Sequence, residues 1–382
     1  MIEKEIYEMI TFEIIGKLKG IKDNDKFSTM EVRDFESGWQ STRYRFNILS
    51  NSNRFMGEIS GGKWSDDKKN RILTFSRATE GKKSEKIEVK WEDRKSQEII
   101  EKVAGFRIYT CNLLTRDEQD ELKAEGKEDE VNKKNHQFLE QTEYAALVKR
   151  VIDSGKYDDA KFRITGAIDF QYSAKDNRYY RTLTVQKMYK VPSDTPCKAE
   201  MTLNTFYTED AIDDAMYDDT QKYIFNCYTD YYFSSIKENR FVPMSLVIKG
   251  TGDDKAAKRA EAFKKKLTEF DDEATVRKCG LVVDMIDGAE EQAITYDDLD
   301  DDTKENIDLG LISLEDTVRG LGGNMYGPRV TEYRVKALAR NSAKGSEATV
   351  YTEEDLRKLP MLEAKEESDV EESVDIFEED DI

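Results

Sequence analysis

Short alternating runs of apolar and polar residues dominate the first third of the chain and predict β-strands. In Ser41–Leu49, every second residue from Thr42 to Ile48 is apolar or β-branched, which places these side chains on one face of a strand. Turn-forming segments such as Gly61-Gly62-Lys63 separate the runs. This spacing is typical of a small barrel or sandwich, and it predicts a β-module over residues 1–114.

The pattern of apolar and polar residues also divides the rest of the chain into predicted segments. Apolar residues recur at helical spacing between Phe138 and Val151, which predicts a helical connector over 115–155. Strand patterns and a basic helix predict a second β-module over 156–285, followed by a small α/β appendage over 286–345. Residues 346–382 read as a linker and a disordered acidic tail. We therefore expect a mainly β fold with α connectors: two modules and an appendage.

The two modules open alike. Each begins with an apolar strand that contains a glycine, Ile15-Gly16-Lys17-Leu18 in one and Ile164-Thr165-Gly166-Ala167-Ile168 in the other. Each continues with a basic and aromatic strand, Arg43-Tyr44-Arg45-Phe46 and Arg178-Tyr179-Tyr180-Arg181. The likeness is compatible with a degenerate duplication, or with chance resemblance between strands.

Charge and reactive side chains exclude several classes of protein. Residues 361–382 hold eleven acidic residues and one lysine, half of the formal net charge of −20. The four cysteines are isolated and the chain has one histidine, so we expect no metal site and no cofactor. No catalytic constellation stands out, which favours a protein that is not an enzyme. No signal peptide or membrane-length apolar run is evident, so we expect a cytoplasmic protein.

Arginines alternate with aromatic residues on several predicted strands, and this pattern is the candidate chemistry. Aromatic rings stack on the bases of single-stranded nucleic acid while basic side chains follow the phosphates. The competing interpretation is that the aromatic residues form the core and the arginines the surface. The candidate nucleic-acid contacts are Trp39, Arg43, Tyr44, Arg45, Trp64, Arg71, Arg178, Tyr179, Tyr180 and Arg181.

The acidic tail carries a second candidate site. Apolar side chains are embedded among its carboxylates, a composition that suits docking to a basic partner or mimicry of a nucleic-acid backbone. The alternative is a tail that only aids solubility. The candidate partner-binding residues are Asp375, Ile376, Phe377, Glu378, Glu379, Asp380, Asp381 and Ile382.

With these residues in view, the layout resembles the single-stranded-DNA-binding proteins of bacteriophages. The likeness rests on Phe162-Arg163-Ile164-Thr165-Gly166-Ala167-Ile168, on the strand that starts at Arg178, and on the tail. It implies two OB-like β-barrels that bind single-stranded DNA in replication or recombination, with the tail recruiting partner proteins and competing with DNA. It also implies a monomer or small homo-oligomer in the cytoplasm, that of the host if a phage encodes it. The tail departs from the bacterial pattern, because Phe377 precedes the last acids and Ile382 forms the tip.

A phage structural or assembly protein built from β-modules is the rival hypothesis. Acidic charge and the lack of catalytic motifs suit it equally well, and self-association without nucleic acid distinguishes the two.

Overall fold

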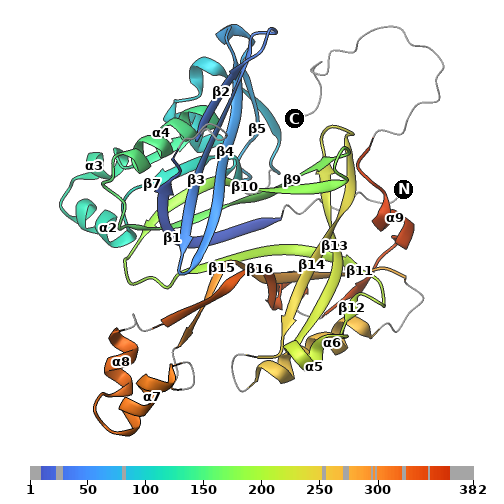
Figure 1. Ribbon diagram of the computed structural model, residues 1–382. Helices are drawn as coiled ribbons and strands as arrows, with labels where there is room; N and C mark the ends of the chain where they lie inside the picture. The colour runs from blue at the N-terminus through green and yellow to red at the C-terminus, as the bar shows by residue number, and fades with distance from the viewer. Residues whose placement is uncertain are drawn as a thin grey trace.

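The computed structural model describes residues 10–22, 29–79, 83–251, 255–269, 275–293, 296, 299–320, 324–342 and 345–361. Over these residues the chain is mainly β with helical connections (Figure 1), which confirms the expected class. The strands are β1 (Thr11–Gly20), β2 (Met30–Asp34), β3 (Trp39–Ser50), β4 (Asn53–Trp64), β5 (Arg71–Phe75), β6 (Lys86–Lys90), β7 (Tyr109–Asn112), β8 (Asn135–Phe138), β9 (Lys161–Ser173), β10 (Arg178–Val191), β11 (Lys198–Tyr207), β12 (Ile212–Asp213), β13 (Lys222–Phe233), β14 (Glu238–Lys249), β15 (Arg277–Ala293), β16 (Asn324–Leu338) and β17 (Glu347–Ala348). The helices are α1 (Gln97–Lys102), α2 (Arg116–Ala124), α3 (Glu128–Asn132), α4 (Gln141–Asp153), α5 (Tyr217–Thr220), α6 (Ala256–Thr268), α7 (Asp301–Asp308), α8 (Leu314–Gly320) and α9 (Glu353–Arg357).

Strands of the first half of the chain pair in a closed cycle, here called the first ring. β1 pairs with β3, β3 with β4, β4 with β10, β10 with β9, and β9 with β1. Every pair is antiparallel except β4–β10, which is parallel. α4 lies between β4 and β9 in the chain, and its Tyr144, Leu147, Val148 and Val151 are buried in the shared core.

The second half of the chain repeats this connectivity in the second ring. β11 pairs with β13, β13 with β14, β14 with β16, β16 with β15, and β15 with β11. Again one pair, β14–β16, is parallel. α6 occupies the place that α4 has in the first ring, between the third and fourth strands, and buries Ala260 and Leu267 in the core.

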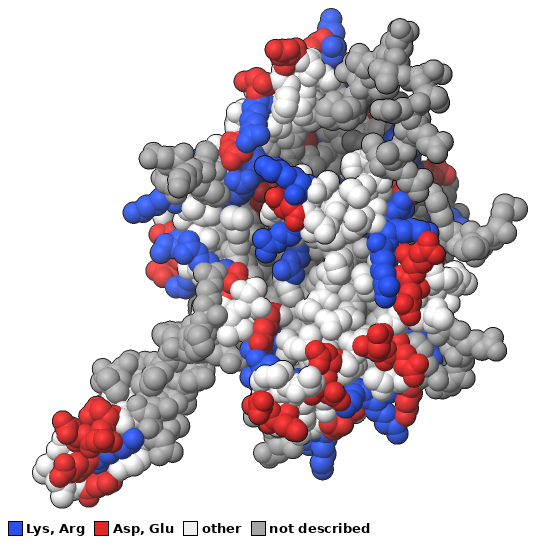
Figure 2. All heavy atoms as spheres, turned by 45° about the vertical axis from the view of Figure 1, so that its right-hand side comes forward, with Lys and Arg blue, Asp and Glu red and all other residues white. Residues whose placement is uncertain are grey.

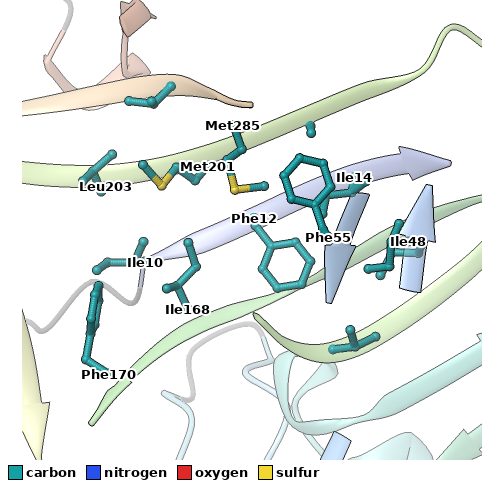
Figure 3. Close-up of a cluster of buried hydrophobic side chains, with 14 of the residues drawn as sticks. Ile10, Phe12, Ile14, Ile48, Phe55, Ile168, Phe170, Met201, Leu203 and Met285 are labelled. Atoms are coloured by element: carbon teal, nitrogen blue, oxygen red, sulfur yellow. The ribbon is translucent and has the colours of Figure 1, made fainter. Parts of the chain in front are cut away.

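The two rings are joined edge to edge. The first half of β1, Thr11–Ile15, pairs with β11, and Gly288 of β15 pairs with Asn53 of β4. Glycine is needed at Gly288, because a Cβ there would lie 2.2 Å from the carbonyl oxygen of Ser52. Figure 3 shows side chains of both rings meeting in one apolar cluster, with Phe12 of β1 near Met201 of β11 and Met285 of β15.

The strands do not pair within the expected module boundaries. β9 and β10 were expected to open the second module, but they complete the first ring. β16 lies in the expected appendage, but it completes the second ring. The supposed duplicate strands, β1 and β9, pair with each other. Periodicity identified the strands, but it contains no information about which distant strand pairs with which.

Three additions decorate the rings. Between β4 and α4 the chain forms the β5–β6 hairpin, α1, and the strands β7 and β8, which extend the sheet from β10. β15 and β16 project as an arm that ends in α7 and α8, at the lower left of Figure 1. The C-terminal segment packs on the second ring, where Leu356 of α9 is buried with Phe206 and Phe241.

Candidate nucleic-acid interface

Trp39 and Trp64 form a cross-strand pair at one end of the β3–β4 hairpin. Their ring centroids lie 5.3 Å apart with the planes at 71°, and both side chains are half-buried. Lys69 places its Nζ 5.5 Å from the centroid of the Trp64 ring. The side chain of Asn70 holds the end of β4, accepting a hydrogen bond from the Trp64 N–H and donating one to its carbonyl. A partly exposed aromatic pair beside a cation can stack on a base and meet a phosphate.

The lack of a side chain at Gly62 leaves room for the indole of Trp39. A Cβ at Gly62 would stand 2.2 Å from Cζ2 of Trp39, so a larger residue would displace the ring. The residue pattern predicted a turn at Gly61-Gly62-Lys63, but these residues lie in β4, and the pattern missed the role of Gly62 because its contact crosses from β4 to β3. It also missed Lys69, whose position depends on the turn after Trp64.

Arg43 and Arg45 lie on the outward face of β3, in an ion-pair network. Arg43 Nε lies 3.2 Å from Glu58, and Arg45 reaches Glu58 at 3.0 Å and Glu31 at 3.2 Å. The side chains of Arg45 and Glu58 are only 16% and 11% exposed. Two arginines thus meet two glutamates from neighbouring strands, so much of the charge predicted to meet phosphates is neutralised within the protein.

Tyr44, one of the candidate nucleic-acid contacts, lies in the core. Its side chain is fully buried and stacks on Phe46 at a centroid distance of 5.5 Å. Burial also raises the pKa of its phenol well above the ordinary value. Alternation correctly placed Tyr44 and Phe46 on one face of β3, and that face is the core.

Arg71 stabilises the turn next to the tryptophan pair. Its guanidinium donates to the carbonyl oxygens of Lys68 and Asn70 at 2.7 and 2.9 Å, and its Nε lies 2.9 Å from Glu88. It therefore fixes the turn that carries Lys69, while about half of its side chain stays exposed.

The β10 candidates occupy several environments. Tyr179 is half-buried against Tyr172 and Phe233, and burial raises its pKa to about 12. Arg181 stacks on Tyr333 of the second ring, 4.6 Å from the ring centroid. Tyr180 is 47% exposed and its hydroxyl donates to Asp176. Arg178 is exposed beside it, so Arg178 and Tyr180 remain available to a ligand.

The structure does not bring the candidates into one cluster. β10 runs parallel to β4 with Leu183 beside Gly57. Arg178 therefore lies near the start of β4 and Trp64 at its end, about 40 Å apart along the strand direction at roughly 3.3 Å per residue. The Arg–Glu network separates the two aromatic groups. The tail residues 375–382 lie outside the described residues.

The surface charge is mixed. Figure 2 shows Lys and Arg side chains interspersed with Asp and Glu on one face, and a gathering of acids on the α7–α8 end at the lower left. The acids of this end are Asp300, Asp301, Asp302, Glu305, Asp308, Glu315 and Asp316. Within the described part of the chain, no group of three or more His, Cys, Asp or Glu residues is arranged to hold a metal ion. Among the described helices, none has the length and apolar content needed to cross a bilayer.

Comparisons with known proteins identify no family for this chain. No family model matches the chain, and no curated protein matches it. Among solved structures, a deletion mutant of the single-stranded DNA binding protein from Thermus aquaticus is similar at 7% sequence identity and a TM-score of 0.29, covering 73% of this chain and 87% of that one. A similarity this low does not bear on what this chain binds.

Proposed function

We propose that this chain is a non-catalytic protein that binds single-stranded DNA on the outward face of its first ring. The tryptophan pair is the observation that carries the proposal. Two indoles on facing strands keep part of their surface exposed, with a lysine beside them. Stacking on such rings contributes about 1–3 kcal/mol per base and tolerates any sequence.

The strand connectivity supports an OB-like reading of both rings. Each is a five-stranded cycle, within the described residues, in which the first strand meets the second and the fourth and the third meets the fifth in parallel. OB-folds bind oligonucleotides on the face of strands 2 and 3 and at the loops after strands 1 and 4. In the first ring strands 2 and 3 are β3 and β4, which carry Trp39 and Trp64. The loop after strand 4 is the turn that precedes Arg178 and Tyr180.

A domain division follows from this proposal. The first barrel spans residues 11–191 and the second 198–338, and the β5–β8 region is an insertion in the first. The DNA-binding role belongs in replication or recombination, with the acidic tail recruiting partner proteins and competing with DNA for basic surface.

Substitution of the tryptophan pair tests the proposal. Trp39→Ala and Trp64→Ala are each expected to weaken binding of a labelled oligo-dT about fivefold to a hundredfold, the equivalent of the stacking energy. Met216→Ala is the matched control, because Met216 is 57% exposed and lies next to α5, outside β3 and β4. Equal affinities for all three variants and the parent chain would remove the tryptophan pair from the interface.

One observation favours the rival, an assembly protein. Large apolar side chains stay exposed at the acidic end of the arm: Leu309 at 65%, Leu311 at 69%, Ile312 at 42% and Leu314 at 36%. Clustered apolar exposure marks contact surfaces between proteins. An assembly protein would form large complexes without DNA, which sedimentation velocity distinguishes from a small, discrete species.

A further inference from the structure

A cleft of about 440 Å³ lies between the segment before α1, strand β8 and helix α4, outside the proposed DNA face. Its size suits a mononucleotide-sized ligand, since small-molecule sites span roughly 300–1,000 Å³. Arg94 and Lys95 come from the segment before α1, Asn135 and His136 from β8, and Arg150 from α4. Sequence reasoning could not find this group, because 56 positions separate its first and last members.

The cleft has a surplus of positive charge. Glu143 is the carboxylate among its lining residues, and it accepts from both Arg94 and Lys95 at 2.9 Å. One negative charge thus faces two positive ones. Arg150 adds a third positive charge and has no ion-pair partner within the described residues. A ligand with two negative charges would balance the lining.

Arg94 is held in place at the wall of the cleft. Its guanidinium lies 4.1 Å from the centroid of the Trp91 ring, and its Nη1 donates to the Trp91 carbonyl oxygen at 2.6 Å. Its Nη2 donates to Glu143. The cleft therefore presents a positive charge whose position is fixed before a ligand binds.

We propose that this cleft binds a phosphomonoester of nucleotide size, with phosphate oxygens accepting from Arg94 and Arg150. Two kinds of ligand carry such a phosphomonoester: a free nucleotide, and a DNA strand that ends in a 5′-phosphate. The proposal does not rest on the proposed DNA-binding function, because it involves other residues on another surface.

His136 supplies the probe. It is the single histidine of the chain and it lines the cleft, so its imidazole resonances report on this site alone. Burial, with Lys134 and Arg150 nearby, lowers the pKa of His136. A bound dianion opposes these effects, so the pKa of His136 should rise when the cleft is filled.

The experiment is a titration of the full chain with dTMP, followed by the His136 imidazole signals in NMR spectra at constant ionic strength. We expect a saturable shift with a Kd below about 1 mM, and no shift with thymidine, which lacks the phosphate. Arg150→Gln and Lys95→Gln should each weaken binding about tenfold or more. Arg357→Gln is the matched control, because Arg357 is 73% exposed on α9, which packs on the second ring.

Two further arms separate the sources. An oligo-dT with a 5′-phosphate should shift the His136 signals if DNA ends occupy the cleft, and one with a 5′-hydroxyl should not. A response to dTMP but to neither oligonucleotide assigns the site to free nucleotides. Absence of a dTMP shift, an equal shift with thymidine or with the 5′-hydroxyl oligonucleotide, or unchanged affinity in both Arg150→Gln and Lys95→Gln would overturn the proposal.

Discussion

Gly62 lies directly beneath the indole of Trp39, so close that a Cβ would stand 2.2 Å from Cζ2 of the ring. Glycine at this position is therefore what allows Trp39 to lie across β4 and meet Trp64 edge-on. The contact couples a backbone feature of β4 to the geometry of the proposed stacking surface, and it can be broken without touching either tryptophan.

Gly62→Ala is expected to push the Trp39 ring aside and weaken oligo-dT binding about fivefold or more, because the ring loses its place beside Trp64. The overpacking should also cost about 1–3 kcal/mol of unfolding free energy. Anisotropy titrations and urea denaturation measure the two effects. Gly105→Ala is the control, since no atom lies within 4 Å of a Cβ there. If Gly62→Ala binds as tightly as the parent chain, the Trp39 geometry has no part in binding.

Arg45→Ala is expected to destabilise the protein by about 1–3 kcal/mol, because the nearly buried carboxylate of Glu58 loses its closest cation and keeps Arg43 at 3.2 Å. Arg33 also pairs with Glu31, but its side chain is 68% exposed, so Arg33→Ala should change the unfolding free energy by no more than about 0.5 kcal/mol. Urea midpoints of both variants test the contrast. A small effect for Arg45→Ala would mean that the network is not structural.

Tyr44→Phe tests the assignment of Tyr44 to the core. Its hydroxyl is buried and has no hydrogen-bond partner within the described residues, so removing it should leave stability unchanged or raise it by about 1 kcal/mol. Oligo-dT affinity should stay the same, because the ring does not reach the surface. A loss of affinity without a loss of stability would restore Tyr44 to the interface.

His136 makes stability depend on pH in a defined direction. Its folded-state pKa is lowered below the ordinary value near 6.5, so the unfolded chain binds the proton more tightly. The unfolding free energy should therefore fall as pH decreases from about 6.5 through the folded-state pKa, and rise in the other direction. His136→Asn should flatten this dependence, which urea denaturation between pH 5 and 7.5 measures. An identical slope in the variant would show that other groups cause it.

The sequence predicted where strands lie better than it predicted which strands pair with each other. Alternation placed Tyr44 and Phe46 on one face of β3 correctly, but Tyr44 could not be assigned to the core or the surface until its neighbours were known. Closure of the first ring depends on β4 meeting β10, residues more than a hundred positions apart, and local pattern contains no signal for such a pair. The Arg43–Glu58 ion pair depends on the register of the β3–β4 hairpin, which the alternating pattern alone does not fix. Trp39 and Trp64 were identified as candidates from residue type, but their contact across β3 and β4 depends on the register of the hairpin.

The most direct test of the central claim is an anisotropy titration of a labelled oligo-dT of about 30 nucleotides with the full chain, at low and moderate salt, with duplex DNA as competitor. We expect saturable binding that weakens as salt rises, because phosphate contacts release counterions, and that equal-length duplex does not displace. Absence of binding at low salt would contradict the account and favour the assembly protein. Displacement by duplex as effective as by the single strand would contradict the preference for single strands.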